Sequence, residues 1–306
     1  MPHGLSLLSI LPIVTAIFVI LWFPESVTHL ATLKTTNSTS PPTTMAAYTQ
    51  DTIMLFGDSI TQGAWEPGKD GFGTRLARHV YARKLDVLNR GLSGYNTEWA
   101  IPVFEKVFAT KAQQPHVPKV RLLTIWFGAN DACIKPSPQH VPLPKFTGNL
   151  KHLISLVRSP TSPHYSPDTK ILLITPPPVN TLQRGADLRS RDPPKELDRE
   201  FKVTEAYAQA VRDVGREEGV PVVDVFQAIW SAAGEKEEEL AKFLGDGLHL
   251  NGAGYEIMYV ELLKAIREKY PELDPDNLRY SFPRWDEVDW TNPAPSIKQR
   301  SIEIPQ

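Results

Sequence analysis

Residues 55–63 read Leu-Phe-Gly-Asp-Ser-Ile-Thr-Gln-Gly, and this stretch decides the fold. The apolar run that leads into it, Thr52–Phe56, is short and rich in β-forming residues, which predicts one buried strand. The residues after it, Ser59–Gly63, are small and polar, so they can turn the strand into a helix and leave a hydroxyl at the end of a sheet. Ser59 is therefore a candidate nucleophile.

Downstream of this stretch, short apolar runs alternate with longer segments of helical period, a pattern typical of parallel strands joined by crossover helices. The predicted strands are Thr52–Phe56, Leu85–Asn89, Val120–Trp126, Ile171–Thr175 and Val220–Val225. The predicted helices are Phe72–Arg83, Thr97–Phe108 with Thr97 as its cap, Phe146–Val157, Leu197–Glu218 and Ala253–Glu268, with shorter ones at 226–231 and 236–243. We expect an α/β fold, a three-layer α/β/α sandwich whose five-stranded parallel sheet has the flavodoxin-like strand order.

Two other segments complete this part of the chain. Thr181–Pro194 is charged, rich in arginine and aperiodic, which predicts a surface loop near the strand ends. Residues 271–306 contain Trp285, Trp290 and several prolines. We expect them to form an extension that lies over the main domain, residues 51–270, or closes its mouth.

The N-terminus has a different character. Leu5–Phe23 is 19 residues without a charge, about 28 Å as a helix, which predicts a transmembrane signal anchor over residues 1–24. Residues 25–50 have the Ser/Thr/Pro-rich composition of a linker and contain a glycosylation sequon at Asn37. This arrangement favours a membrane-anchored protein with a lumenal or extracellular domain. The alternative is a cytosolic domain, if translation starts at Met45.

Composition excludes several classes of function. The 306 residues are 41% hydrophobic and 22% charged, which is ordinary for a globular chain and supplies a sizeable core. The formal net charge is −2 and no stripe of Lys and Arg is present, so nothing favours nucleic-acid binding. Cys133 is the single cysteine, which excludes an intramolecular disulfide framework and a cysteine-based zinc cluster.

Polar residues follow the predicted strands at their carboxyl ends, where the loops of an open α/β sheet converge on one crevice. A serine hydroxyl needs a base within hydrogen-bond reach, and His249 is the candidate. Asp246, three residues earlier, can orient this histidine if both lie in a loop, which Gly247 permits. The Asn130 amide and the backbone N–H groups of Gly94 and Ser59 could stabilise an oxyanion.

Each of these signals is weak in isolation. Gly-Asp-Ser is a common turn sequence, Asn130 and Asp131 could satisfy local backbone groups, and Asp-x-x-His occurs by chance. Their order and placement at successive strand ends indicate one catalytic site. We expect most of the other histidines, such as His79, His116, His152 and His164, to be solvated surface residues.

The same residues carry a resemblance. Four blocks of the sequence resemble those of the SGNH (GDSL-type) hydrolase superfamily: Gly57-Asp58-Ser59, Gly94, residues 128–131 and residues 246–249. More closely, residues 89–97, 174–178 and 246–250 look like the isoamyl acetate-hydrolysing esterase family. The resemblance spans about Thr52–Tyr270. It implies a serine esterase without metal or cofactor, in which Ser59, Asp246 and His249 form the triad and Ser59, Gly94 and Asn130 the oxyanion hole.

Three functions remain open at this point. The first is hydrolysis of short-chain, acetate-type carboxylic esters through a covalent acyl-enzyme, with a small ester as the substrate and the membrane contacted only through the N-terminal segment. The second is removal of O-acetyl groups from a carbohydrate or cell-wall polymer by the same triad. The third is a non-catalytic, membrane-tethered binding protein in which the triad is a relic. The sequence leaves the oligomeric state open.

Overall fold

The computed structural model describes residues 50–300. Within them, a five-stranded parallel sheet has the order β2-β1-β3-β4-β5. The strands are β1 Thr52–Asp58, β2 Asp86–Leu92, β3 Val120–Trp126, β4 Lys170–Ile174 and β5 Val222–Val223. This is the flavodoxin-like order, so the predicted α/β fold class is confirmed.

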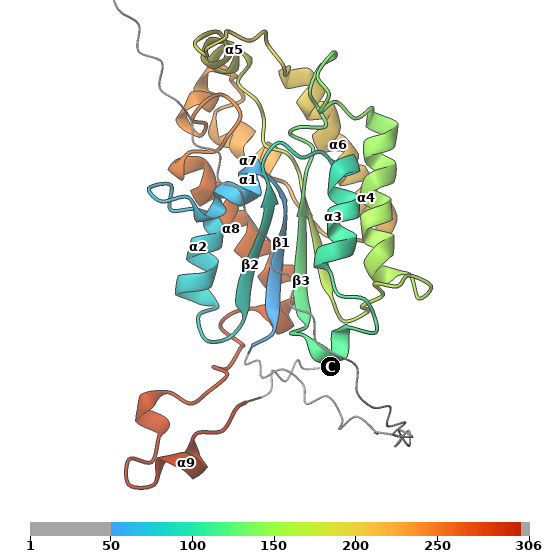
Figure 1. Cartoon of the computed structure of the whole chain (residues 1–306). Coiled ribbons are helices and arrows are strands. Elements are labelled where there is room, and N and C mark those ends of the chain that lie inside the picture. The colour runs from blue at the N-terminus through green and yellow to red at the C-terminus, as the bar shows by residue number, and fades with distance from the viewer. Residues whose placement is uncertain (1–49, 301–306) are drawn as a thin grey trace, which may run out of the picture. The chain divides into compact units, whose positions relative to one another are not determined.

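Helices cover both faces of the sheet (Figure 1). One layer contains α3 (Thr97–Val107), α4 (Leu143–Arg158) and α6 (Phe201–Glu218). The other contains α2 (Phe72–Arg75), α7 (Val225–Ala232) and α8 (Gly252–Lys269). The remaining helices are α1 (Ser59–Gln62), α5 (Thr181–Arg189), α9 (Pro293–Ser296), a π-helical turn at Leu76–Val80, and 3₁₀ turns at Gly63–Trp65, Gln114–His116, Glu238–Lys242, Pro271–Leu273 and Trp285–Glu287.

The alternation of side chains along β1 explains the three layers. Ile53 and Leu55 belong to the hydrophobic cluster beneath α2, α7 and α8, whereas Met54 and Phe56 belong to the cluster beneath α3, α4 and α6. Successive residues of a strand point to opposite faces, so a continuous apolar run needs a cover on both sides. All seven residues of β1 are buried, and the strand lies inside the sheet, between β2 and β3.

Several predicted boundaries were wrong for local reasons. Asn96, not Thr97, caps α3, because its side chain accepts the backbone N–H of Trp99 at 2.9 Å. The fifth strand is shorter than predicted, because Asp224 caps α7 and ends the extended backbone. His164, predicted to be solvated, is buried, with its Nδ1 atom 2.8 Å from the carbonyl of Phe108.

The segment predicted as the surface loop 181–194 contains the helix α5, which begins at Thr181. Asn180 caps it by accepting the backbone N–H of Gln183 at 2.9 Å. Figure 1 shows α5 beyond the carboxyl ends of the strands, at the same end of the sheet as α1. This helix therefore contributes to the end of the domain where the candidate site residues lie.

The described part of the C-terminal extension, residues 271–300, contacts the opposite end of the domain. The hydroxyl of Tyr81 donates to the carbonyl of Leu273 at 2.8 Å, and the N–H of Ser281 donates to the carbonyl of Arg83 at 2.8 Å. Arg83 lies just before the amino end of β2. The described part of the extension, residues 271–300, therefore packs at the amino ends of the strands, opposite the end that carries Ser59.

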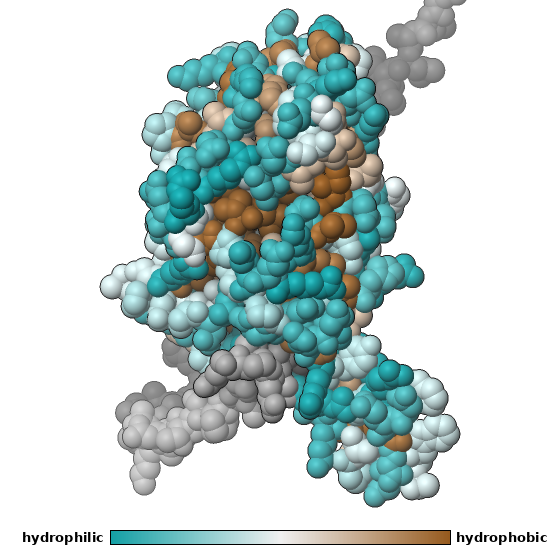
Figure 2. Space-filling view, turned by 180° about the vertical axis from the view of Figure 1, so that it is seen from behind, coloured by the Kyte–Doolittle hydropathy of each residue, from teal (hydrophilic) through white to brown (hydrophobic). Residues whose placement is uncertain are grey.

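The surface is mixed in polarity. The face seen from behind is hydrophilic over most of its area, with hydrophobic residues exposed in a band across its middle (Figure 2). Between residues 50 and 300, no helix is long and apolar enough to span a membrane. The predicted anchor, residues 1–24, and all but the last residue of the predicted linker, residues 25–50, lie outside the described residues.

Candidate active site

Ser59 is the first residue of α1, at the carboxyl end of β1. Asp58 caps this short helix by accepting the backbone N–H of Ile60 at 2.9 Å. The turn also needs Gly57, because a Cβ there would lie 2.1 Å from the Oγ1 atom of Thr61 and 2.6 Å from the carbonyl oxygen of Trp126. The tight turn leaves the Ser59 side chain half-buried at the end of the sheet.

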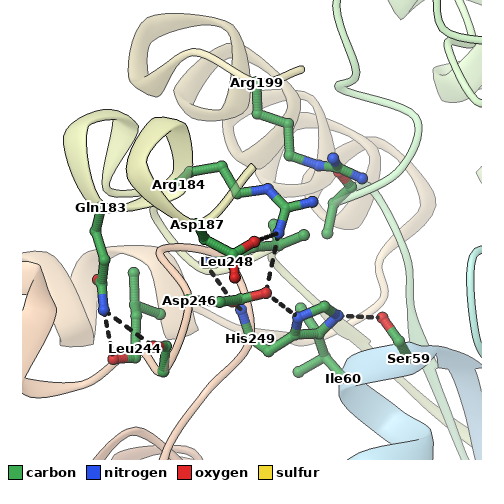
Figure 3. Close-up of polar contacts among 12 residues, drawn as sticks. Ser59, Ile60, Gln183, Arg184, Asp187, Arg199, Leu244, Asp246, Leu248 and His249 are labelled. Carbon is green, nitrogen blue, oxygen red and sulfur yellow. Dashed lines mark hydrogen bonds and ion pairs between the residues drawn. The ribbon is translucent and has the colours of Figure 1, made fainter. Parts of the chain in front are cut away.

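His249 and Asp246 lie beside this serine (Figure 3). The Nε2 atom of His249 is 2.9 Å from the Oγ atom of Ser59, and its Nδ1 atom is 2.8 Å from the Oδ2 atom of Asp246. With Nδ1 protonated, the ring donates to the carboxylate and its Nε2 atom can accept the serine proton. The three predicted residues therefore form one hydrogen-bonded line.

The loop that contains Asp246 and His249 is held by its own carboxylate. The Oδ1 atom of Asp246 accepts the backbone N–H groups of Leu248 at 3.0 Å and His249 at 2.8 Å. Gly247 has φ +83°, a backbone conformation that residues other than glycine rarely adopt. The loop thus brings the carboxylate of Asp246 and the imidazole of His249, three positions later, within hydrogen-bond distance.

The ionised form of Asp246 is favoured although its side chain is partly buried. Burial alone would raise the pKa of this carboxyl. The hydrogen bond from the His249 ring, the charge of that ring and two backbone N–H groups outweigh burial and hold the pKa of Asp246 well below its usual range. Asp246 is therefore an anion at neutral pH and can stabilise a cationic His249.

Gly94 and Asn130 follow β2 and β3, the two strands that flank β1. The side-chain nitrogen of Asn130 donates to the backbone carbonyl of Tyr95 at 2.9 Å and has a second N–H group. Gly94 has φ +79°, and its carbonyl accepts the side-chain amide of Gln139 at 2.7 Å. The predicted oxyanion donors thus lie in loops on both sides of the strand that ends at Ser59.

Sequence reasoning missed Arg184, Asp198 and Arg199. Arg184 donates to the Oδ2 atom of Asp246 at 2.9 Å (Figure 3). Arg199 donates to the Oδ1 atom of Asn130 at 2.7 Å. Arg184 lies in the segment 181–194, which is charged and aperiodic and was predicted to be a surface loop. Asp198 and Arg199 lie at the start of the predicted helix Leu197–Glu218, where no pattern distinguishes a buried charge from a solvated one. The signal that could have located α5 was Asn180, a capping residue shortly after the fourth strand and its prolines.

Two further carboxyl groups are buried next to the site. Burial raises the pKa of Asp58 to about 7, against the opposing effect of the Ile60 N–H. Burial also raises the pKa of Asp131 to about 6, against hydrogen bonds from Thr97. The Oδ1 atom of Asp131 accepts the backbone N–H of Thr97 at 2.9 Å and its hydroxyl at 2.5 Å. Asp131 therefore fixes the start of α3 beside the loop of Gly94.

A cavity of about 600 Å³ opens at Ser59. Its lining combines the candidate catalytic residues with polar and aromatic side chains: Ser59, Gln62, Gly63, Trp65, Glu66, Lys69, Ser93, Gly245, Asp246, His249 and Tyr255. Among residues 50–300, no group of three or more His, Cys, Asp or Glu side chains is arranged to hold a metal ion.

Known proteins resemble this chain in sequence. The profile of the GDSL-like lipase/acylhydrolase family matches residues 55–257. An isoamyl acetate-hydrolyzing esterase of Saccharomyces cerevisiae is 34% identical over 242 residues, covering 77% of this chain and 94% of that protein. A GDSL esterase/lipase of Arabidopsis thaliana is 34% identical over 256 residues, covering 82% of this chain and 98% of that protein.

Solved structures share the fold. A lipase/acylhydrolase from Enterococcus faecalis has a TM-score of 0.53 and 24% identity, covering 76% of this chain and 98% of the other. An acetylxylan esterase from Geobacillus stearothermophilus has a TM-score of 0.52 and 20% identity, covering 72% of this chain and 96% of the other. The family profile spans more than half of the sequence and includes Ser59 and His249. The chain therefore belongs to the GDSL-like lipase/acylhydrolase family of carboxylic ester hydrolases.

Proposed function

We propose that the protein hydrolyses short-chain, acetate-type esters through Ser59, His249 and Asp246. The observation that supports this most directly is the hydrogen-bonded line of these three residues, with distances of 2.9 Å and 2.8 Å. The yeast relative is an isoamyl acetate-hydrolyzing esterase, which supports an acetate as the acyl group.

In the first half of the reaction, His249 removes the proton of Ser59 while the Oγ atom attacks the ester carbonyl. The negative charge that develops on the carbonyl oxygen is stabilised by the N–H groups of Ser59 and Gly94 and by the Asn130 amide. The tetrahedral intermediate then releases the alcohol, which takes the proton from His249. The product of this half-reaction is an acyl-enzyme on Ser59.

In the second half, His249 removes a proton from water, and the resulting hydroxide attacks the acyl carbon. The intermediate collapses, the acid leaves, and the proton on His249 returns to the Oγ atom of Ser59. Asp246 remains ionised throughout and stabilises the imidazolium form of His249.

The test is a panel of p-nitrophenyl acetate, butyrate and octanoate together with isoamyl acetate, assayed with the full chain and with Ser59→Ala. We expect turnover to decrease with acyl length and to be lost in the folded Ser59→Ala variant. A fluorophosphonate should label Ser59 covalently. Undiminished turnover by Ser59→Ala would overturn the roles assigned here, and absence of both turnover and labelling would favour the non-catalytic binding protein.

A second candidate substrate, an O-acetylated carbohydrate, is favoured by the lining of the cavity. Trp65 is 37% exposed, and Glu66 and Lys69 form an ion pair of 2.7 Å next to it. An aromatic face with nearby hydrogen-bonding groups suits a sugar ring as the alcohol. Faster release of acetate from acetylated xylooligosaccharides than from alkyl acetates, decreased by Trp65→Ala, would favour this substrate; equal loss on both substrates would exclude a sugar-specific role for Trp65.

We also propose that the apolar segment Leu5–Phe23 anchors the protein in a membrane, with the catalytic domain in the lumen or outside the cell. The uncharged length of this segment and the sequon at Asn37 support the proposal. A mobility shift on glycosidase treatment that is lost in Asn37→Gln would support a lumenal domain. Recovery of the full chain in the cytosolic fraction, without a shift, would contradict it.

A further inference from the structure

Two buried arginines connect the residues assigned to the base and to the oxyanion hole. Arg184 is 5% exposed, and its guanidinium donates to Asp246 at 2.9 Å. Arg199 is 2% exposed, and it donates to the Asn130 side-chain oxygen at 2.7 Å and to the carbonyl of Ala129 at 2.8 Å. The two arginines therefore contact the two halves of the candidate site.

One carboxylate joins the two arginines. Asp198 accepts the Nε and Nη2 groups of Arg184, each at 3.1 Å, and the Nη1 group of Arg199 at 2.5 Å. The pKa of Asp198 lies below its usual range: burial would raise it, but the hydrogen bond from Arg184 and the charges of both arginines outweigh burial. The resulting chain runs from Asp246 through Arg184, Asp198 and Arg199 to Asn130.

Such a chain is costly to build for stability alone. Burying a guanidinium removes it from water, and a buried ion pair often stabilises a fold no more than apolar residues of similar volume. Two planar guanidinium groups with several fixed donors each are well suited to holding an oxygen acceptor in one orientation. The acceptors here are the Oδ2 atom of Asp246 and the Oδ1 atom of Asn130.

We propose that Arg184, Asp198 and Arg199 act as a positioning bridge that holds Asp246 and Asn130 in their working orientations. This proposal rests on the ester hydrolysis proposed above. Arg184 neutralises part of the charge of the carboxylate that contacts His249. Arg199 keeps the oxygen of the Asn130 amide turned away from the oxyanion, so that the nitrogen faces the loop of Gly94 and Tyr95.

The two arginines differ in what their loss should change. Without Arg199, the Asn130 amide can rotate and present an acceptor to the developing oxyanion, which lowers kcat. Without Arg184, the charge of Asp246 is less balanced and favours protonated His249, so the acid limb of the kcat/KM profile should move to higher pH. Other charged groups around Asp246 and His249 come from several elements. They are Asp58 from β1, Glu66 and Lys69 on the cavity wall, Asp187 on α5, and Arg191, whose Nη2 atom is 3.9 Å from Asp246.

The test uses the full chain with p-nitrophenyl acetate and compares Arg199→Met, Arg199→Lys, Arg184→Met and Arg184→Lys. Arg212 offers a matched control, since it forms a two-bonded pair with Asp224, at 2.7 Å and 3.1 Å, and contacts no residue assigned to the site. We expect Arg199→Met to lower kcat about tenfold or more with KM nearly unchanged. We expect Arg184→Met to shift the acid limb upward, Arg184→Lys to restore most of the wild-type profile, and Arg212→Met to change neither quantity.

A double-mutant cycle separates positioning from a loss of general stability. If Arg199 acts through Asn130, the Arg199→Met change should lower kcat far less in an Asn130→Ala background than in the wild type. Circular dichroism and urea unfolding verify that each variant is folded. If neither methionine variant folds, Arg199→Lys decides, since it keeps the charge and loses the fork that binds Asn130.

The outcomes separate the two proposals. Three results would each overturn the positioning bridge while ester hydrolysis stands. The first is a wild-type kcat and pH profile in folded Arg184→Met and Arg199→Met variants. The others are additive effects of Arg199→Met and Asn130→Ala, and full kcat in Arg199→Lys. A wild-type chain that neither hydrolyses esters nor reacts with the fluorophosphonate would overturn the proposed function itself.

Discussion

The phenolic hydroxyl of Tyr255 donates a hydrogen bond of 2.7 Å to the backbone carbonyl of Ile60. Tyr255 lies in α8, the helix that follows the loop of His249, and Ile60 lies in α1, next to Ser59. This bond therefore connects the element that carries the proposed base to the element that carries the proposed nucleophile. The ring of Tyr255 is buried against Phe72, which fixes the direction of the Tyr255 hydroxyl.

The first prediction concerns this bond. Tyr255→Phe should keep the packing but leave a buried carbonyl without its partner, lowering the free energy of unfolding by about 1–3 kcal/mol. It should also lower kcat several-fold, because the Ser59–His249 distance is less well fixed. Urea unfolding and ester kinetics measure the two effects.

Tyr270 provides the matched control, since its buried hydroxyl donates to the carbonyl of Ile171 at 2.8 Å, near the amino end of β4. Tyr270→Phe should cost similar stability without a change in kcat. An equal decrease of kcat in both variants would show that the Tyr255 bond has no special connection to the site.

The second prediction tests the oxyanion donor. Asn130→Ala removes the side-chain amide, and loss of one such donor typically lowers kcat by about 10²–10³-fold. We expect KM for p-nitrophenyl acetate to change little, because the donor acts on charge that develops in the transition state. Steady-state kinetics measure both constants, and a large increase of KM with unchanged kcat would assign Asn130 to ground-state binding instead.

The third prediction concerns Gly247, which needs both its backbone conformation and its lack of a side chain. Its φ is +83°, and a Cβ there would lie 2.4 Å from the backbone nitrogen of Arg184 and 2.7 Å from the carbonyl oxygen of Asn180. Gly247→Ala should therefore destabilise the fold and separate Asp246 from His249. The midpoint temperature of thermal unfolding and kcat should both decrease.

Gly234 serves as the control for conformation alone. Its φ is +63°, but a Cβ there would meet nothing within 4 Å. Gly234→Ala should cost only the strain of the left-handed conformation, about 1–2 kcal/mol. If Gly247→Ala is no more harmful than Gly234→Ala, the close approach of α5 to the Asp246 loop contributes nothing to the site.

The sequence was sufficient for features that depend on local pattern. The alternation of short apolar runs with segments of helical period predicted the parallel sheet and its two helical layers. The structure agrees, since Ile53 and Met54, which are neighbours in β1, pack into different clusters. The turn at Gly57 and the loop at Gly247 were likewise recognisable, because a glycine followed by polar residues at a strand end has few alternative conformations.

Long-range pairing was not predictable in the same way. Arg184 and Arg199 contact Asp246 and Asn130, from which they are 62 and 69 positions distant. In the sequence, Arg184 lies in an aperiodic charged segment and Arg199 at the start of a predicted helix, and nothing local distinguishes a buried guanidinium from a solvated one. Their burial depends on the acceptors that the fold places around them, which only the three-dimensional arrangement supplies.

The fourth prediction uses Asp58, the buried carboxyl beside Ser59. Burial raises the pKa of Asp58 from 3.8 to about 7, against the hydrogen bond from the Ile60 N–H and the charge of His249. Between pH 4 and pH 7 the unfolded chain has released this proton, whereas the folded chain still retains it. The unfolded state binds fewer protons in this window, so the contribution of Asp58 to stability decreases as pH rises.

Asp58→Asn removes this dependence and can still accept the Ile60 N–H through its side-chain oxygen. The variant should therefore become more stable relative to the wild type as pH rises through the window, by about 1.4 kcal/mol for each pH unit, with no further gain above pH 7. Asp213 is the control, because it is exposed and its pKa is lowered by hydrogen bonds from Gln209 and Arg216. Urea unfolding of the three proteins from pH 4 to pH 8 measures the difference. A constant difference between Asp58→Asn and the wild type, or the same gain in Asp213→Asn, would show that Asp58 does not retain its proton in the folded protein.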